Sequence, residues 1–559
     1  MSKWLICAAW PYINAVPHLG TLIGSVLSAD VIARYLRLKG EEVVFVSGSD
    51  EHGTPIEVEA IKLKISPKEL TDKYHQLVKK LFERWNISFD NYSRTENPIH
   101  VDFVRRFYLK LYERGYIYEK EIEMPFCSQC QMFLPDRFIE GECPYCHYKG
   151  ARGDQCDSCG RLLEPTRLIN PRCNICGGKP IIKRTKHWFF DLPKLANELY
   201  KYIENNEKLP PNARNMSLAM LREGLKPRAI TRDNKWGIPA PFPGSEGKTI
   251  YVWMEAVLGY ITATIEFFNR RGEENRWKEF WLNEDTKSVY FIGKDNIPFH
   301  TIIFPALLIA SGENYVLPWT VSSTEYLLFR GEKFSKSRRV GIWIDEALEL
   351  FPVDYWRFSL LINRPENKDF NFTWEAFKES VNSHLNDTIG NFIHRTLTFI
   401  YKNFGSKIPK VNNLFEEDEK EVNKVKGMVQ KTEKLLDDFK IRESLITIVS
   451  IAAEGNRYLN ERAPWDLIKT NRDKAAQVMY VAAYIVKVLA VTLYPFIPTS
   501  AQKIWNMLGY EGVTRDWGEA YILPKAGQQI KKPKPVFKKI SDEDLKNALQ
   551  KLEEIRQRN

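Results

Sequence analysis

The chain has 559 residues, 44% of them hydrophobic and 27% charged, which is the composition of a soluble globular protein. One hydrophobic core rarely serves so long a chain, so we expect roughly two to four domains. No stretch reaches the roughly 20 uncharged apolar residues of a membrane-spanning helix, because the best candidate, 478–498, contains Lys487 and prolines. Lys and Arg exceed Asp and Glu by 81 − 71 = 10, which favours an anionic partner without identifying it.

The first predicted element is a buried strand at 4–9. Its apolar run breaks at Pro11 and leads into a loop, so it is interpreted as a strand and not as a signal peptide. A second apolar run at 42–47 predicts another buried strand, and apolar residues at helical spacing predict a helix over 22–36 between them. Further helices are predicted at 67–86 and 98–114. This alternation predicts an α/β fold with a doubly wound parallel sheet. The lack of a membrane-spanning stretch predicts no membrane partner, and an N-terminal strand in place of a signal peptide predicts a cytoplasmic location.

The composition changes between 119 and about 183, where Cys, Gly and Pro replace the helical pattern. Strand-like runs return at 229–239, 248–254 and 288–294, followed by an apolar helix at 298–311. We therefore interpret the cysteine-rich part as a module inserted into one nucleotide-binding domain.

The part beyond about 375 is predicted to be a helix bundle. Helical patterns lie near 375–404, 417–440, 442–461, 471–492 and 498–508, with prolines between several of them. A Lys- and Pro-rich tail begins at 524 and ends in a predicted short helix at 541–557.

Eight of the nine cysteines form four Cys-x-x-Cys pairs, which predict two structural zinc sites. Each pair presents two thiolates on one tight turn, and two pairs complete a tetrahedron with no position left for catalytic water. The pairs begin at Cys127, Cys143, Cys156 and Cys173. Similar spacings of 143 − 127 = 16 and 173 − 156 = 17 suggest pairing the first with the second and the third with the fourth, but other pairings remain open.

Two loops carry candidate chemistry. His18 and Gly20 follow the first strand, where an open α/β sheet binds ligands, and His18 can donate to a phosphate. Lys333 and Lys336 lie three residues apart in a basic, hydroxyl-rich turn that can neutralise charge on a polyphosphate. Taken singly, the histidine is more often structural and the basic turn is more often only solvated. Their occurrence together favours a nucleotide site.

The pair of loops resembles the signatures of class I aminoacyl-tRNA synthetases, His-Ile-Gly-His and Lys-Met-Ser-Lys-Ser, here His18-Leu-Gly-Thr21 and Lys333-Phe-Ser-Lys-Ser337. The resemblance implies that ATP, carried with Mg²⁺, is attacked at its α-phosphate by an amino-acid carboxylate. His18 would contact the phosphates, Lys336 would stabilise the transition state and Lys333 would support it. Thr21 departs from the second His of the family, so it receives no strong catalytic role.

Longer segments resemble the methionyl-tRNA synthetases over nearly the whole chain: AWPYINAVPHLGT at 9–21, GSDEHGTP at 48–55, ITRDNKWGIP at 230–239, YVWMEAVLGY at 251–260 and FIGKDNIPFH at 291–300. The resemblance implies that Asp50 holds the substrate ammonium. It also implies a methionine pocket of Ala9, Tyr12, Trp253, Ala256, Tyr260, Phe299 and His300, and an ATP site of His18, Gly20, Thr21, Gly293, Asp295, Asn296 and Lys336. Aromatic walls suit a polarizable thioether, although without the family the same aromatics would be interpreted as ordinary core. Trp10 and Val257 stand where bacterial members commonly have Leu and Pro.

The same family implies nested zinc sites, with Cys143, Cys146, Cys156 and Cys159 at one and Cys127, Cys130, Cys173 and Cys176 at the other. It also implies that Asn391, Arg395 and Trp465 read the CAU anticodon of initiator and elongator tRNA(Met), although Trp465 alone could be a core residue. We expect a monomer, with a separate tRNA-binding protein as a potential helper, since no oligonucleotide-binding appendage is present in the sequence.

The expected domains are the Rossmann-type catalytic domain (1–114 and 226–320), the zinc-knuckle insertion (115–225), a stem-contact region with the Lys-Phe-Ser-Lys-Ser loop (321–375), the helical anticodon-binding domain (376–523) and a C-terminal tail and helix (524–559). Two rival functions remain. One is a class I synthetase for Leu, Ile, Val or Cys, and the first three usually carry a large editing insertion. The other is a non-enzymatic RNA-binding paralogue, which the intact His18, Lys336 and Asp50 disfavour.

Overall fold

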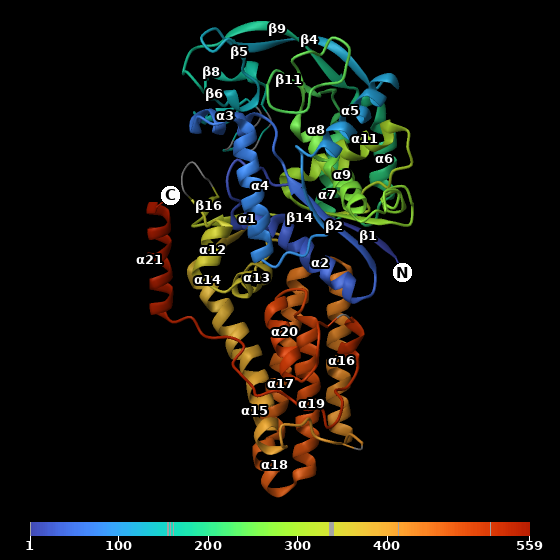
Figure 1. The fold of residues 1–559 in the computed structure, drawn as a ribbon, viewed down its shortest axis with the longest axis vertical. Helices are drawn as coiled ribbons and strands as arrows, with labels where there is room; N and C mark the ends of the chain where they lie inside the picture. Colours follow the sequence, from blue (N-terminus) through green and yellow to red (C-terminus); the bar gives the residue numbers. More distant parts are fainter. Residues whose placement is uncertain are drawn as a thin grey trace.

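The computed structural model describes residues 2–153, 156, 158–159, 161, 163–334, 340–411, 413–514 and 516–558. Lys336 therefore lies outside the described residues. Figure 1 shows the arrangement along the long axis: the inserted module at the top, the α/β sheet and its helices below it, and the helical domain at the bottom.

The core of the catalytic part is a five-stranded parallel sheet in the order β14-β13-β1-β2-β3. Its strands are β1 (Lys3–Ala8), β2 (Glu42–Ser49), β3 (Asn91–Arg94), β13 (Lys287–Gly293) and β14 (Thr320–Thr324). The predicted doubly wound sheet is confirmed. The sequence pattern did not predict β3, because its four residues, NYSR, are mostly polar and lie at the sheet edge.

The helices around this sheet match the predicted spans closely. The predicted helix at 22–36 is a continuous stretch of α1 (Leu19–Thr21), the π-helix η1 (Leu22–Val26) and α2 (Leu27–Leu38). The next are α3 (Thr54–Leu63), α4 (Pro67–Arg84) and α5 (Pro98–Glu113). Ser66 forms a reciprocal capping box with Glu69 at the start of α4, and the Asn97 side chain caps the start of α5. Such caps mark a helix start in the sequence, in agreement with the predicted starts of these two helices.

The inserted module is built on two long antiparallel strands, β4 (Ile117–Cys127) and β9 (Ile181–Phe190), flanked by β5 (Met132–Phe133) and β10 (Arg228–Ala229). A second small sheet contains β6 (Ile139–Glu142), β7 (Ala151–Arg152) and β8 (Ile169–Cys173). Two helices, α6 (Ala196–Asn205) and α7 (Pro211–Glu223), lead back to the catalytic part.

Two of the three strand-like runs predicted to resume the main sheet do not join it. The run at 229–239 contributes β10 to the module and β11 (Thr231–Arg232), which pairs only with β12 (Thr249–Ile250). The end of the run at 248–254 is helical, as the start of α8 (Val252–Ala256). A short apolar run is compatible with a buried helix as well as with a strand, so the prediction was wrong there. The run at 288–294 is β13, as predicted.

The elements that follow complete the catalytic part. They are α9 (Gly259–Arg270), α10 (Lys278–Trp281), the π-helix η6 (Phe299–Ile303) with α11 (Phe304–Ser311), the strands β15 (Leu327–Phe329), β16 (Glu332–Lys333) and β17 (Phe370–Phe372), and the helices α12 (Ile344–Leu350) and α13 (Val353–Ile362). Strand β15 pairs with β16 and β17, so the base of the basic loop is tied to a small sheet of its own.

The remaining chain forms the predicted helical domain. A long helix is continuous through α14 (Trp374–Glu379), the π-helix η7 (Ser380–Gly390) and α15 (Asn391–Asn403). It is followed by α16 (Glu416–Asp437), α17 (Ile441–Arg462), α18 (Pro464–Thr470), α19 (Arg472–Thr492) and α20 (Pro498–Met507). The last helix, α21 (Asp542–Arg558), returns to the catalytic part beside α12 (Figure 1).

Two described helical stretches are long and apolar enough to cross a membrane, Leu19–Leu38 and Arg472–Thr492. In the protein 78% and 94% of their apolar windows are buried, so both are core helices. Lys487 in α19 is itself buried, with its ammonium bonded to Glu519 and to the Ile522 carbonyl.

Candidate active site and cysteine clusters

The His18 loop and the basic loop lie together, as predicted. The backbone of the His18 loop pairs with the segment that follows the basic loop, through Leu19 N–H to Ile342 O and Ile344 N–H to Pro17 O, each 3.0 Å. The His18 ring stacks on Phe334, with centroids 4.7 Å apart. Side-chain packing therefore joins the two signature segments directly.

The orientation of His18 is set by the start of its own helix. Its Nδ1 accepts the Thr21 backbone N–H at 3.1 Å, so the proton of the neutral ring is on Nε2. A Cβ at Gly20 would lie 3.0 Å from the His18 ring, which explains the need for glycine there. Thr21 contributes a backbone donor to this arrangement, and its hydroxyl lies 3.5 Å from His18 Nδ1.

Lys333 is held at the edge of the predicted adenosine site. Its ammonium lies 4.1 Å from the centroid of the Tyr326 ring, and Lys294 lies at the same distance from that ring. The Tyr326 hydroxyl donates to Asp295 at 2.5 Å. A Cβ at Gly293 would meet nothing within 4 Å, so the backbone there borders open space. Lys336, the other predicted catalytic lysine, lies outside the described residues.

Asp50 lies at the carboxyl end of β2, beside the loop that follows β1. Its backbone pairs with that loop through Asp50 N–H to Pro11 O at 3.0 Å and Ile13 N–H to Asp50 O at 3.3 Å. The side chain is 4% exposed, and its Oδ1 is buried without a hydrogen-bond partner among the described residues. Burial, together with the nearby Glu255, raises the Asp50 pKa well above its usual range. Such a carboxyl is suited to binding a cation.

The predicted aromatic walls also lie together. Trp253 Nε1–H donates to the Tyr12 hydroxyl at 2.5 Å, and the Trp253 and Phe299 rings meet edge to face at 4.5 Å. Tyr260 O–H donates to His300 Nε2 at 2.9 Å, while His300 Nδ1–H donates to the Asn296 carbonyl. Burial lowers the His300 pKa to about 4, so His300 is neutral at physiological pH.

Trp10, which was not among the predicted pocket residues, also lies in this region. A Cβ at either Gly48 or Gly259 would lie 2.6 Å from its ring, so two glycines make the space that the indole fills. Trp10 also meets Tyr260 edge to face at 6.4 Å. The larger residue at position 10 is therefore matched to small residues on β2 and α9. Val257 is 5% exposed in the hydrophobic core.

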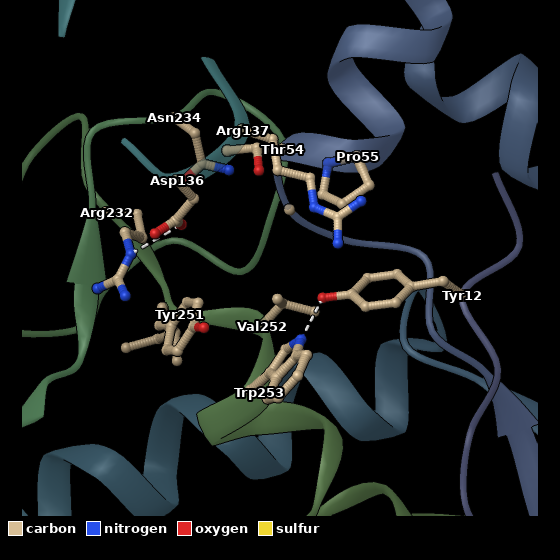
Figure 2. Close-up of a pocket in the computed structure, with 12 residues that line it drawn as sticks. Tyr12, Thr54, Pro55, Asp136, Arg137, Arg232, Asn234, Tyr251, Val252 and Trp253 are labelled. Atoms are coloured by element: carbon tan, nitrogen blue, oxygen red, sulfur yellow. Dashed lines mark hydrogen bonds and ion pairs between the residues drawn. The ribbon is translucent and has the colours of Figure 1, made fainter. Parts of the chain in front are cut away.

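A cavity opens beside Tyr12 and Trp253 toward the inserted module (Figure 2). It is small, with a volume of about 20 Å³ available to the centre of a water-sized sphere. Figure 2 shows the Arg137 guanidinium projecting toward Tyr12, and Arg232 paired with Asp136 at 3.1 Å. Arg232 also lies over the Tyr251 ring at 3.7 Å. The sequence analysis gave no role to these polar residues: Arg232 lies in the quoted segment 230–239 without an assignment, and Asp136 and Arg137 come from the cysteine-rich module.

The eight paired cysteines form two clusters, and the nested pairing is confirmed. Cys127, Cys130, Cys173 and Cys176 form one cluster, and Cys143, Cys146, Cys156 and Cys159 the other, with ligand atoms within 4.8 Å of one another. The Sγ–Sγ distances are 3.4 and 3.9 Å in the first and 3.6 and 3.9 Å in the second. Tetrahedral zinc with bonds of about 2.3 Å needs roughly 3.8 Å, and a disulfide about 2.05 Å. The residues fit zinc.

At the far end of the helical domain, Arg395 of α15 lies over the Trp465 ring of α18 at 5.3 Å. The Arg395 guanidinium also donates to Asn460 at 2.9 Å, and Asn391 lies one helical turn before Arg395. Asn391 is exposed and Trp465 is 38% exposed. The three predicted residues therefore share one accessible surface, and Trp465 is not a buried core residue.

Two family models match the chain. Residues 4–397 match a model described as tRNA synthetases class I (M), and residues 408–557 match the anticodon binding domain of methionyl tRNA ligase. A methionine–tRNA ligase of Thermofilum pendens is 59% identical over 556 residues, covering 99% of this chain and 98% of the relative. One from Pyrobaculum aerophilum is 56% identical over 556 residues, covering 100% and 97%.

The fold also matches a solved structure, the Mycobacterium tuberculosis methionyl-tRNA synthetase in complex with methionyl-adenylate. The TM-score is 0.80 at 23% identity, with 96% of this chain and 100% of that chain covered. The shared fold includes both the α/β part and the helical part.

Proposed function

The chain belongs to the methionyl-tRNA synthetases of class I, and from this premise we propose how its residues activate methionine and recognise tRNA. As a methionine–tRNA ligase it acts on methionine, ATP and tRNA(Met). The contact between His18 and Phe334 carries the proposal, because it brings the nucleotide loop and the basic loop to one site.

In the proposed reaction His18 donates from Nε2 to a phosphate of ATP. Its Nδ1 is held by the Thr21 backbone, which supports this orientation. Gly293, Asp295 and Asn296 border the adenosine, and Gly20 and Thr21 the phosphates. Lys336 stabilises the charge that develops at the α-phosphate, and Lys333 supports it. Mg²⁺ arrives with ATP and neutralises part of the phosphate charge.

Asp50 binds the methionine ammonium in this proposal. A buried carboxylate oxygen without a partner supports the role, because a bound ammonium would satisfy it. The thioether lies among Ala9, Tyr12, Trp253, Ala256, Tyr260, Phe299 and His300. Several of these walls are only half-buried in the described structure, which supports a space between them that a substrate fills.

The two cysteine clusters are proposed to bind one structural zinc each. Four thiolates leave no ligand position for water, so the ions would hold the module and do no hydrolytic chemistry. The domain boundaries expected from the sequence and the cytoplasmic location stay proposals. The monomeric state is also a proposal, and size-exclusion chromatography would test it.

Recognition of the anticodon is assigned to Asn391, Arg395 and Trp465. An accessible indole with a guanidinium beside it supports stacking of an unpaired base and hydrogen bonding to its edge. Initiator and elongator tRNA(Met) share this anticodon, so both are proposed substrates.

The experiment that tests the site is ATP–pyrophosphate exchange with the Lys336→Ala variant. Loss of the positive charge at the α-phosphate should lower methionine-dependent exchange by about 10²- to 10³-fold, as for other preorganised donors. Affinity for tRNA(Met), measured by filter binding, should change little. Arg84→Ala is the control, since it likewise removes a cation, one that is half-exposed and paired with Glu349. An unchanged exchange rate in Lys336→Ala would remove its catalytic role.

A further inference from the structure

Behind Asp50 lies a buried polar cluster that has no role in the proposed chemistry so far. Its centre is His52, with its side chain 1% exposed, between two carboxylates. His52 Nδ1 lies 2.6 Å from Glu255 Oε1, and His52 Nε2 lies 2.5 Å from Glu96 Oε1. The second oxygen of Glu255 is 3.2 Å from His100 Nε2.

The geometry fixes the protonation of His52. A carboxylate only accepts hydrogen bonds, so a ring with a carboxylate oxygen at each nitrogen must donate from both, which only the imidazolium does. Burial alone would lower the His52 pKa, but Glu255 and Glu96 raise it to about 10. The ring is therefore a buried cation at physiological pH.

The other carboxylates of this cluster each have a cation beside them, although they share it with a second carboxylate. Glu51 is bonded to Arg94 at 2.8 Å, and Glu255 and Glu96 share the His52 cation. Asp50 has no ion pair among the described residues, and its Oδ1 has no hydrogen bond. Asp50 is thus the carboxyl of this cluster that has no cationic side chain beside it among the described residues, at the position where the substrate ammonium is proposed to bind.

The same bonds join the two walls of the methionine site. Strand β2 ends at Ser49, and His52 lies two residues after Asp50 in the loop that follows. The His52 backbone N–H donates to the Asp50 carboxylate. Glu255 belongs to α8, the helix that also carries Trp253 and Ala256. The charged His52–Glu255 contact therefore sets the separation between the ammonium-binding group and the side-chain pocket.

We propose that His52 is a positioning residue for methionine: it fixes Asp50 against the Trp253 wall and places a positive charge beside Glu255, which leaves Asp50 as the carboxyl open to the ammonium. The inference rests on the proposed assignment of Asp50. His52 does not touch the substrate; it acts through Asp50 and Glu255. Its loss should affect methionine and leave ATP binding almost unchanged.

The test is ATP–pyrophosphate exchange with His52→Gln, with KM measured separately for methionine and for ATP. A displacement of about 1 Å can lower a rate by about a hundredfold, so kcat/KM for methionine should fall by about ten- to a hundredfold. KM for ATP should stay close to that of the unchanged protein. Binding of methioninol, which keeps the ammonium and lacks the carboxylate, should weaken in parallel by tryptophan fluorescence.

Two further variants keep the test decisive if His52→Gln folds poorly. Glu96→Gln removes one carboxylate at the partly exposed edge of the cluster, keeps the side-chain size, and should raise the methionine KM less than His52→Gln does. His75→Gln is the matched control: His75 is buried and bonded to Ser49 of β2 at 2.9 Å, and among the described residues no hydrogen bond or ion pair joins it to α8. Its kinetic constants should not change.

The outcomes separate the inference from the assignment on which it rests. If Asp50→Asn raises the methionine KM while His52→Gln and Glu96→Gln leave it unchanged in folded protein, the inference is wrong and the assignment of Asp50 stands. If Asp50→Asn also leaves the methionine KM unchanged, the assignment fails. Equal rises in the methionine and ATP constants of His52→Gln, with a lower melting temperature, would indicate a purely structural role and overturn the inference.

Discussion

Asp50 combines burial with a position beside other acidic groups. Burial, Glu255 and Glu51 raise its pKa, while His52 opposes that rise. The carboxyl of the free protein therefore keeps its proton at pH values where an exposed Asp is ionised. Because only the carboxylate pairs with an ammonium, methionine affinity should increase as pH rises through the elevated pKa, and binding should release a proton. Calorimetry in buffers of different ionisation enthalpy measures that proton directly.

The control for this prediction is Asp50→Asn, which cannot titrate. It should bind methionine more weakly and release no proton. His300 does not complicate the measurement above pH 5, since burial lowers its pKa to about 4. Proton release of the same size in Asp50→Asn would contradict the assignment.

The sequence predicted which residues belong to the candidate site, but not the contacts that orient them. His18, Gly20 and Lys333 were predictable because short signature loops carry them, and Asp50 because it stands in a long motif. The partners that orient them were not predictable. The Tyr326 ring beneath Lys333 and the Gly48 and Gly259 pair around Trp10 depend on contacts between distant segments. No local pattern records such contacts.

Among the elements, regular helices were predicted well and short strands were not. Repeated apolar spacing and side-chain caps make helices such as α4 visible over several turns. Strands β11 and β12 have two residues each, which is too short for an alternating pattern. Helix α8 is short and mostly buried, so its apolar sequence resembles that of a strand. The cysteine pairing was open on spacing alone, and the return of β8 beside β6 brings Cys173 back toward Cys127.

The nested clusters predict a specific pattern of zinc loss. Removing two thiolates from one cluster, as in Cys127→Ser/Cys176→Ser, should lower the zinc content from about two to about one per chain. Cys127→Ser/Cys143→Ser takes one thiolate from each cluster and should weaken both sites. Plasma emission spectrometry with a chelator titration distinguishes the two results. A loss of both ions in the first variant would contradict independent clusters.

On the scale of the whole molecule, the proposed anticodon surface lies at the opposite end of the chain's long axis from the inserted module (Figure 1). Trp465→Ala should therefore weaken aminoacylation of tRNA(Met) by roughly tenfold or more, since stacking on one base contributes about 1–3 kcal/mol. Methionine-dependent pyrophosphate exchange needs no tRNA and should be unchanged. Tyr200→Ala is the control, because Tyr200 is an exposed residue of α6. Trp343→Ala would not serve, because the backbone of Trp343 pairs with that of His18. Equal loss in both assays would indicate a folding defect.

A buried arginine of the catalytic part, Arg357, forms an ion pair there and also bonds the helical domain. Arg357 of α13 bonds Asp30 of α2 at 2.7 Å with both side chains fully buried, and it also donates to the Phe496 and Trp85 carbonyls. Burial alone would raise the Asp30 pKa, but Arg34 and Arg357 hold it at about 2. A pKa below the unfolded value of about 3.9 means that this contribution to stability is present above that pH and is lost as pH falls toward 2.

Removing Arg357 leaves the buried Asp30 with Arg34 as its remaining cationic partner and leaves the Phe496 and Trp85 carbonyls without their donor. Arg357→Ala should therefore lower the free energy of unfolding by roughly 3–5 kcal/mol in guanidinium titrations near neutral pH. Breaking the exposed pair of Arg84 and Glu349 by Arg84→Ala should cost no more than about 1 kcal/mol. If the two variants lose equal stability, the interface is not held by Arg357, and packing between α2, α13 and α19 would have to account for the junction.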